Sequence, residues 1–419
     1  MVLGQQLMKI VVKVASVVAL ARRFEESPTV AMQEIITEVR RSFAATLERV
    51  MDAELALFLG QPAERSNKRN GYVTRTFAIH GMGAVQLRVP RDRAGRFKTA
   101  VVPARRRYDE AIEKDLALLH LAGLSTRMLA TLSGRVLGMR LSAQEVSNAL
   151  DKIVPAARAF LERDLSDRKF KYLYIDGTNF RVRRTTVDLE PTLVVVGVDD
   201  TDRKSVLAGI SGDKESKAAW EMVFANLKER GLDASTVELG IMDGLPGLAA
   251  AFREAFPRAR VARCWVHKAR NVMPRVPRRY QAEFKTSWDA VQYADGTETA
   301  RAAFVALDER WTSVCADAVN SMRRDIDALL VHYEFPREHW DALRTTNPIE
   351  RVNKELKRRS KAMETIGADA LLTLLAFTAL RLEFHWRQTP LTSNKLSRLR
   401  YREHLDAKRL ESLTQIVTH

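Results

Sequence analysis

Cysteine and long apolar runs are scarce in this sequence of 419 residues, and basic residues outnumber acidic ones. Two cysteines cannot form a disulfide framework, which excludes a disulfide-stapled secreted protein and favours a reducing cytoplasm. The apolar stretch at residues 10–21 is interrupted by Lys13 and is too short to span a membrane. This stretch is typical of an amphipathic helix rather than a signal peptide, so no membrane partner is predicted.

The charge balance indicates a polyanionic partner. The chain has 68 Lys and Arg against 52 Asp and Glu, a net charge of +16, and a pI near 10. Such an excess favours nucleic acid over a membrane surface. Hydrophobic residues make up 46% and charged residues 29%, which is ordinary for a globular protein, and the length predicts two or three domains.

The first part of the chain, residues 1–165, is interpreted as a mostly helical DNA-binding region. Apolar spacing predicts a helix at 30–59, and short capped helices are expected at 116–121, 125–137 and 142–153, where a helix-turn-helix is possible. Residues 61–110 carry twelve Lys or Arg against four Asp or Glu and alternate like short strands, with a turn expected at Asn70-Gly71. Arg69, Arg91 and Arg93 are candidate DNA contacts, although a solvated sheet face would also carry such charge.

From residue 171 the pattern changes to strands. Apolar strands are expected at 171–177, 192–198 and 205–210, then a helix at 214–230, a strand at 237–243, a helix at 246–256 and a strand at 261–265. This order is typical of a ribonuclease-H-like α/β sheet. We therefore expect a catalytic core at 166–265 and 340–390, a helical insertion at 266–339 because eighty residues are too long for a loop, and a basic tail at 391–419.

A helix starting near residue 347 combines one carboxylate with a strip of positive charge. Asn347 and Pro348 suit the cap and the first turn, and Ile349, Val352, Leu356 and Met363 form an apolar stripe. Another face carries acidic and basic side chains, namely Glu350, Lys354, Lys357, Arg358 and Lys361. That face suits metal-dependent chemistry on a phosphate backbone, whereas Asn-x-x-Glu is also the pattern of a capping box.

Two aspartates could complete an acidic site with Glu350. Asp176 and Asp243 each end an expected apolar strand and each precede Gly. If the first and fourth strands are neighbours, these carboxylates lie side by side and, with Glu350, could hold two divalent ions at a phosphodiester. Asp-Gly after a strand is also a plain turn. The three residues in this order of elements are less easily explained as two turns and a cap.

Several motifs in the same order make the chain resemble the Mutator-type family of bacterial insertion-sequence transposases along nearly its whole length. The matching stretches are residues 69–72, 89–97, 123–127, 174–178, 242–244, 263–268 with Asn271, and 346–351. The resemblance implies a DDE active site with Asp176, Asp243 and Glu350 as the catalytic, metal-binding triad. Mg²⁺, with Mn²⁺ as a substitute and two ions expected, is the implied cofactor.

The resemblance also implies a function. A DNA transposase would bind the terminal inverted repeats of its element as a homodimer or larger assembly, cut a strand and transfer it to target DNA, in a bacterial cytoplasm at the nucleoid. Arg351, Lys354, Lys357 and Arg358 would hold the DNA backbone beside the metals. A DNA-binding protein without catalysis, or another ribonuclease-H-like nuclease or integrase, is the alternative.

Cys264 and His267 match the Cys-x-x-His signature of this family. A single such pair does not predict zinc, which takes four ligands, and no second pair with matching spacing is present in the sequence. We expect these two side chains to pack or hydrogen-bond near the active site.

Overall fold

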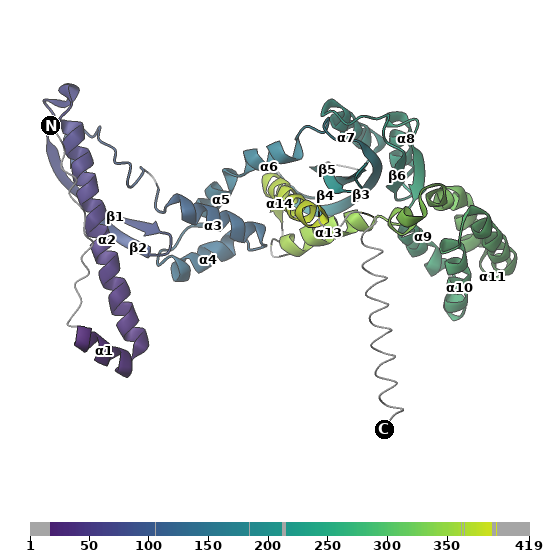
Figure 1. Cartoon of the computed structure of the whole chain (residues 1–419), viewed down its shortest axis with the longest axis horizontal. Coiled ribbons are helices and arrows are strands. Elements are labelled where there is room, and N and C mark those ends of the chain that lie inside the picture. Colours follow the sequence, from purple (N-terminus) through teal and green to yellow (C-terminus); the bar gives the residue numbers. More distant parts are fainter. Residues whose placement is uncertain are drawn as a thin grey trace. The chain divides into compact units, whose positions relative to one another are not determined.

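The computed structural model describes residues 17–104, 106–183, 185–211, 215–361, 363, 365–387 and 391. The chain divides into two compact units, Met1–Lys152 and Ile153–His419 (Figure 1). The start of the amphipathic stretch at 10–21, and the basic tail expected at 391–419 except Leu391, lie outside the described residues. Among the residues that are described, no helix is long and apolar enough to cross a membrane.

The first unit opens with helices and a hairpin. Helix α1 (Val17–Glu26) and the long α2 (Pro28–Leu59) are followed by a 3₁₀ turn (Pro62–Glu64) and the antiparallel strands β1 (Arg69–Ile79) and β2 (Gly83–Asp92). Helix α2 packs on β2 around Met51, Phe77 and Leu87. The hairpin turn expected at Asn70-Gly71 is wrong. Gly71, with φ of +70°, lies at a register irregularity inside β1, and the chain reverses between Ile79 and Gly83.

Three short helices complete this unit. They are α3 (Glu110–Leu121), α4 (Thr126–Val136) and α5 (Ala143–Asp151). Ser125 and Ser142 accept hydrogen bonds from backbone N–H groups of the first turns of α4 and α5, and Ser142 with Glu145 forms a full capping box. These caps confirm the expected helix starts, because Ser oxygens satisfy N–H groups that have no partner within the helix.

The second unit is built on a mixed sheet. Strands β3 (Phe170–Arg183), β4 (Val187–Asp199) and β5 (Lys204–Ser211) are antiparallel, while β6 (Leu239–Met242) and β7 (Arg260–Arg263) run parallel to β3. The strand order is β5-β4-β3-β6-β7, and β8 (Ile366–Gly367) pairs with the far end of β3. The expected order of elements and the pairing of the first and fourth strands are confirmed. The expected end of the first strand at Asp176 is wrong, because β3 continues to Arg183.

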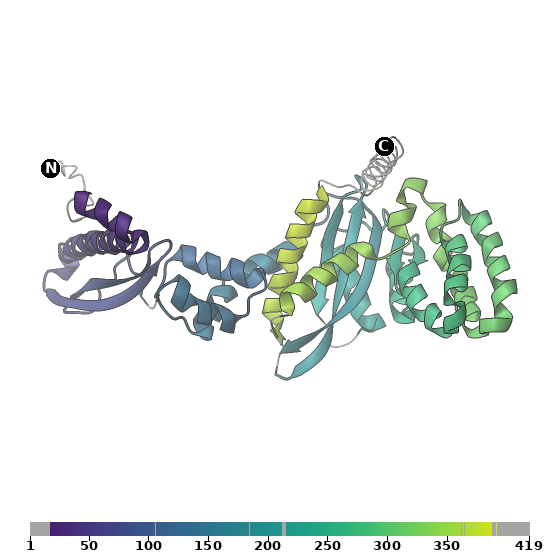
Figure 2. The ribbon, with the colours of Figure 1, turned by 90° about the horizontal axis from the view of Figure 1, so that it is seen from below.

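Helices cover both faces of this sheet (Figure 1 and Figure 2). Helices α7 (Lys217–Glu229) and α8 (Pro246–Ala255) bury Trp220, Phe224 and Phe252 against Leu173 and Ile175 of β3. Helices α13 (Asn347–Ser360) and α14 (Ala368–Arg387) contact β3, β4 and β5 on the other face, and α6 (Val154–Leu161) packs on α14. Side chains alternate between faces along a strand, so the buried residues at 172–175 of β3 face the two pairs of helices in turn.

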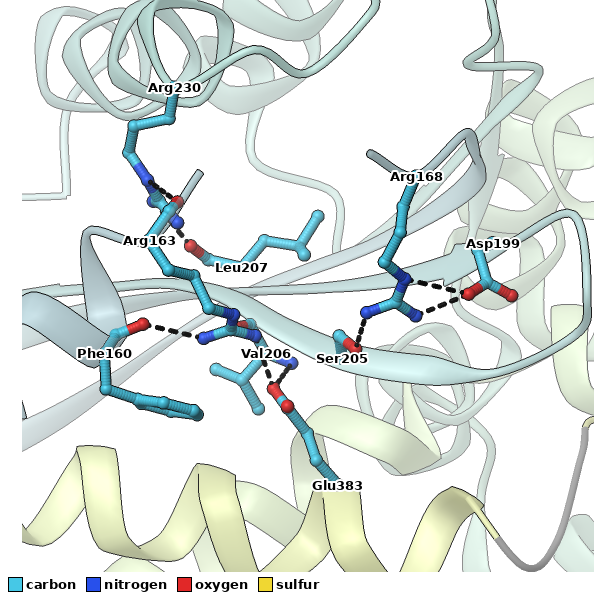
Figure 3. Close-up of polar contacts among 9 residues, drawn as sticks. All are labelled: Phe160, Arg163, Arg168, Asp199, Ser205, Val206, Leu207, Arg230 and Glu383. Atoms are coloured by element: carbon cyan, nitrogen blue, oxygen red, sulfur yellow. Dashed lines mark hydrogen bonds and ion pairs between the residues drawn. The ribbon is translucent and has the colours of Figure 1, made fainter. Parts of the chain in front are cut away.

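Arginines bind the edge of the sheet to the helices around it (Figure 3). The Arg163 guanidinium donates to Glu383 Oε1 of α14 at 2.7 Å and to the Val206 carbonyl of β5 at 3.0 Å. Arg230, which follows α7, donates to the Leu207 carbonyl at 2.8 Å. These bonds satisfy the Val206 and Leu207 carbonyls on the edge strand β5.

The segment between β7 and α13 is helical, as expected. It contains α9 (Trp265–Val272), α10 (Gln281–Gln292), α11 (Thr297–Leu330) and α12 (Trp340–Leu343), with 3₁₀ turns at Met273–Arg275, Arg278–Tyr280, Val331–Glu334 and Arg337–His339. Its core is separate from that of the sheet and includes Trp265, Trp288 and Trp311. Lys268 of α9 is buried and donates to the Ser321 carbonyl of α11 at 2.7 Å. This bond joins α9, the helix that follows β7, to the long helix α11 of the insertion.

Candidate active site

Asp176 and Asp243 occupy neighbouring positions on adjacent parallel strands. In the register of β3 and β6, Ile175 lies opposite Met242, so the next residue of each strand is the aspartate. Strand β6 ends at Met242, and Asp243 lies where the chain leaves the sheet to enter α8. The carboxyl end of a parallel strand at a change of direction is a common position for functional side chains.

The turn interpretation of the two Asp-Gly pairs is only partly right. Gly177 lies inside β3 opposite Leu193, and neither Gly177 nor Gly244 has a positive φ. Asp243 does stabilise a local turn, since its Oδ1 accepts the Leu245 N–H at 3.1 Å. A Cβ on either glycine would collide with a neighbouring side chain, the Glu215 carboxylate at Gly177 and the Arg263 guanidinium at Gly244. A larger residue at either position would therefore displace the end of the neighbouring side chain, the Glu215 carboxylate or the Arg263 guanidinium.

Glu350 is not a capping residue. Helix α13 starts at Asn347, its N-cap is Thr346, and no side chain caps it, so the expected cap at Asn347 and the capping box are both wrong. Instead, Glu350 Oε1 lies 3.4 Å from Arg270 Nη2 and 4.0 Å from His267 Nε2. The apolar stripe behind it is confirmed for Ile349, Val352 and Leu356, which are completely buried. Docking of this stripe directs Glu350 towards α9.

The charges of these groups influence one another. Burial, followed by the charges of Asp243 and Glu350, raises the pKa of Asp176 to about 6, although the charge of His267 opposes this rise. The pKa of His267 rises to about 9 against the effect of burial, chiefly through Cys264 and then through Asp176 and Asp243. His267 Nδ1 nevertheless has no hydrogen-bond partner at normal distance within the described structure. The three predicted acidic residues therefore share one electrostatic environment.

The donor chemistry of this environment fits a hard divalent cation. Mg²⁺ and Mn²⁺ prefer carboxylate oxygens, and crowded carboxylates with a raised pKa are relieved by added positive charge. As arranged in the part of the chain described, no three His, Cys, Asp or Glu side chains close around a single metal position. The residues thus fit the cation by chemistry and by strand register, without forming a completed coordination sphere.

Cys264 links the start of α9 to the start of α13. Its side chain is completely buried, and its Sγ accepts a hydrogen bond from Thr346 Oγ1 at 3.4 Å. The neighbouring His267 and the hydrogen bond from Thr346 lower the pKa of the Cys264 thiol even though burial, the largest influence, raises it. This contact supports the predicted packing role of Cys264, because it holds α9, with His267, beside the first turn of α13, with Glu350.

Sequence reasoning missed two side chains of this region. Arg270 follows His267 by three residues and so shares its face of α9, a helical spacing that could have indicated it. Glu215 precedes α7, and its carboxylate lies against Gly177 of β3. No local pattern indicates Glu215, since it lies 38 positions from Gly177, the residue that it contacts.

The predicted basic residues fall in two places. Arg351, Lys354, Lys357 and Arg358 are exposed on α13, where Arg358 pairs with Glu355 at 3.2 Å while, among the described residues, Lys354 and Lys357 form no ion pair. Arg69, Arg91 and Arg93 are exposed on the hairpin of the first unit, and Arg69 pairs with Asp52 at 3.0 Å. Among the described residues, Arg351, Lys354 and Lys357 are therefore exposed and without an ion pair, and so available to an anionic partner.

Comparison with known proteins agrees with these observations. Residues 16–389 match the family described as Transposase, Mutator family. The chain is 31% identical over 335 residues to the transposase for insertion sequence element IS905 of Lactococcus lactis, covering 78% of this chain and 84% of that protein. It is 29% identical over 357 residues to the transposase for element ISRM5 of Rhizobium meliloti, covering 84% and 89% of the two chains. A match of this extent means that the chain belongs to the Mutator family of transposases.

Proposed function

We propose that this protein is a DNA transposase that binds the terminal inverted repeats of its own insertion sequence, cuts at their tips and transfers the freed strand to target DNA. The observation that carries the proposal is the register of β3 and β6, which puts Asp176 beside Asp243, with Glu350 in electrostatic range on α13. Membership of the Mutator family supports the same conclusion.

We assign the sheet of the second unit to the ribonuclease-H-like class. Three antiparallel strands followed by two parallel ones, in the order β5-β4-β3-β6-β7, with helices on both faces, support the assignment. In this class the acidic residues lie on the first strand, after the fourth strand and on a late helix, which are the positions of Asp176, Asp243 and Glu350.

Asp176, Asp243 and Glu350 would hold Mg²⁺ or Mn²⁺, and we expect two ions to bind. When bound, such ions lower the pKa of water and stabilise charge on the leaving oxygen of a phosphodiester. The three carboxylates provide negative charge and oxygen donors, and Arg270 and His267 orient Glu350 through its Oε1. His267 remains protonated near neutral pH, because its raised pKa of about 9 lies above that range.

Basic residues of both units would contact DNA. Arg351, Lys354, Lys357 and Arg358 lie on the exposed side of the helix that carries Glu350, so a phosphate backbone held there lies close to the acidic residues. Arg69, Arg91 and Arg93, with the three short helices α3, α4 and α5, would bind the inverted repeats. We expect the protein to act as a homodimer or larger assembly at the bacterial nucleoid.

The test uses linear DNA carrying the sequences that flank this gene, with Mg²⁺ or Mn²⁺, and maps the 3′ ends that are released. The wild type should cut at the repeat tips, whereas Asp176→Asn, Asp243→Asn and Glu350→Gln should not. Asp327→Asn, which changes a largely exposed carboxylate of α11, is the matched control and should cut normally. Cutting by the Glu350→Gln protein would remove Glu350 from the site, and binding of repeats without any cut would favour a DNA-binding protein that lacks catalysis.

A further inference from the structure

We propose that Glu215 is a fourth carboxylate of the candidate active site and that it helps Asp176 and Asp243 to hold the divalent cation. This inference rests on the proposed metal-dependent function. It adds a residue that precedes α7 to a site otherwise formed by β3, β6 and α13.

The position of Glu215 is defined by packing. The carboxylate lies on Gly177, the residue directly after Asp176, and a Cβ built on Gly177 would stand 2.7–2.8 Å from both Glu215 oxygens and from Cδ. The backbone of Gly177 lies in the ordinary strand region, where any residue is allowed, so its conformation does not require glycine. The Glu215 carboxylate occupies the space that a side chain at position 177 would fill, so it lies against the residue directly after Asp176 in the sequence of β3.

Local structure holds Glu215 at this place. Ser216 is the N-cap of α7, and its Oγ accepts the Ala219 N–H at 3.2 Å. Trp220 and Phe224 of α7 lie in the core of the sheet, so the start of the helix is anchored directly after the cap. A residue directly before a capped and docked helix has little freedom to move its backbone.

Among the described residues, no basic side chain forms an ion pair with Glu215. Lys217, two residues after Glu215, pairs instead with Glu221 at 3.0 Å and Glu254 at 2.7 Å. Burial, then the charges of Asp243 and Asp176, raise the pKa of Glu215 to about 7. Glu350, by contrast, has Arg270 and His267 beside it. An exposed carboxylate that is close to two others, and that has no ion pair within the part of the chain described, is a suitable ligand for a divalent cation.

The two glutamates approach the aspartates from opposite sides. Glu350 is carried by α13 on one face of the sheet, and Glu215 precedes α7 on the other face. Asp176, on β3, and Asp243, directly after β6, lie between these elements. The two aspartates can therefore bind one cation together with Glu350 and a second cation together with Glu215.

The experiment measures Mn²⁺ binding to the full-length protein by calorimetry and by the Mn²⁺-induced shift of the unfolding temperature. Glu215→Gln should weaken Mn²⁺ binding at least tenfold, because a charged oxygen ligand is replaced by a neutral amide. Its unfolding temperature without metal should stay equal to that of the wild type or rise, because repulsion with Asp176 and Asp243 is removed. A merely structural role would instead lower that temperature and leave the affinity unchanged.

Two further variants sharpen the test. Gly177→Ala should displace the Glu215 carboxylate and weaken Mn²⁺ binding similarly, and the Gly177→Ala/Glu215→Gln double variant should bind no more weakly than Glu215→Gln alone, since both changes remove one interaction. Glu221→Gln, on α7 and paired with Lys217, is the matched control and should bind like the wild type.

The outcomes separate this inference from the proposed function. If Asp176→Asn abolishes Mn²⁺ binding while Glu215→Gln binds with wild-type affinity, Glu215 is not a ligand and the proposed function stands. If the wild type neither binds Mn²⁺ nor cuts DNA, the metal site as a whole is refuted, and Glu215 with it.

Discussion

Replacing Asp325 with alanine should strongly destabilise the second unit. Asp325 of α11 accepts from two cations, Arg263 of β7 at 2.6 Å and the buried Lys268 of α9. Hydrogen bonds to charged groups contribute about 1.5–3 kcal/mol each, and leaving a buried charge without its partner costs about 3–5 kcal/mol. Asp325→Ala removes the carboxylate partner of the buried Lys268, although Lys268 keeps its two bonds to Ser321. We therefore expect this change to lower the free energy of unfolding by about 3–5 kcal/mol.

Urea unfolding followed by tryptophan fluorescence measures the free energy of unfolding of the second unit. All six tryptophans lie after residue 152, so their emission reports on the second unit alone. The matched control is Asp327→Ala, two residues further along α11, whose exposed pair with Arg301 should contribute less than about 1 kcal/mol.

A second measurement examines the cause of the loss. Burial lowers the pKa of Lys268, so the unfolded chain holds this proton more tightly than the native protein, and raising the pH favours the native state. Without Asp325, Lys268 should lose its proton more readily, so the cost of Asp325→Ala should be smaller at pH 9 than at pH 7. Equal losses for Asp325→Ala and Asp327→Ala, or a cost that does not depend on pH, would refute the reasoning.

Three further changes test other parts of the fold. Arg163→Ala should cost about 3 kcal/mol, because it leaves the buried Glu383 carboxylate without its guanidinium, and urea unfolding measures this loss. Gly240→Ala should cost about 1–3 kcal/mol, since the new methyl group would fall on the buried Phe252 ring, and a lower unfolding temperature would reveal it. Burial lowers the pKa of His332 to about 4, so stability should fall by about 2 kcal/mol from pH 7 to pH 5, and His332→Asn should show a smaller fall.

The basic face of α13 gives a test on DNA. Replacing both Lys354 and Lys357 with glutamine should reduce the slope of log affinity against log salt by about 2, because each lysine that contacts a phosphate releases about one counterion. Lys285→Gln, which changes an exposed lysine of α10, is the control for charge alone. An unchanged slope in the double variant would remove α13 from the DNA interface.

Local patterns in the sequence were enough for most helices and for the order of strands. Ile349, Val352 and Leu356 repeat at helical spacing and are buried together, and Ser125 and Ser142 cap the helices that they precede. These features depend on residues only a few positions apart. The positions of Asp176 and Asp243 beside apolar strand residues could be predicted because this pattern is also local.

Two local signals were misinterpreted. After Gly177, exposed Arg181 and Arg183 alternate with buried Phe180 and Val182, so the period of a strand was present although the strand was expected to end. Asn347 resembles an N-cap, but Thr346 holds that position and its hydroxyl donates to Cys264 instead of capping the helix. In both cases a long-range partner, β4 or Cys264, decided the outcome.

Only the tertiary structure determined which side chains of the candidate site lie close together. Glu215 and Gly177 are 38 residues apart, and Arg270 and Glu350 are 80 apart, so no spacing in the sequence relates them. Their proximity follows from the parallel register of β3 with β6 and from the docking of α7 and α13 on the sheet. Residue types and local periodicity specify which side chains are available, whereas the pairing of strands and the burial of helix faces specify which of them meet.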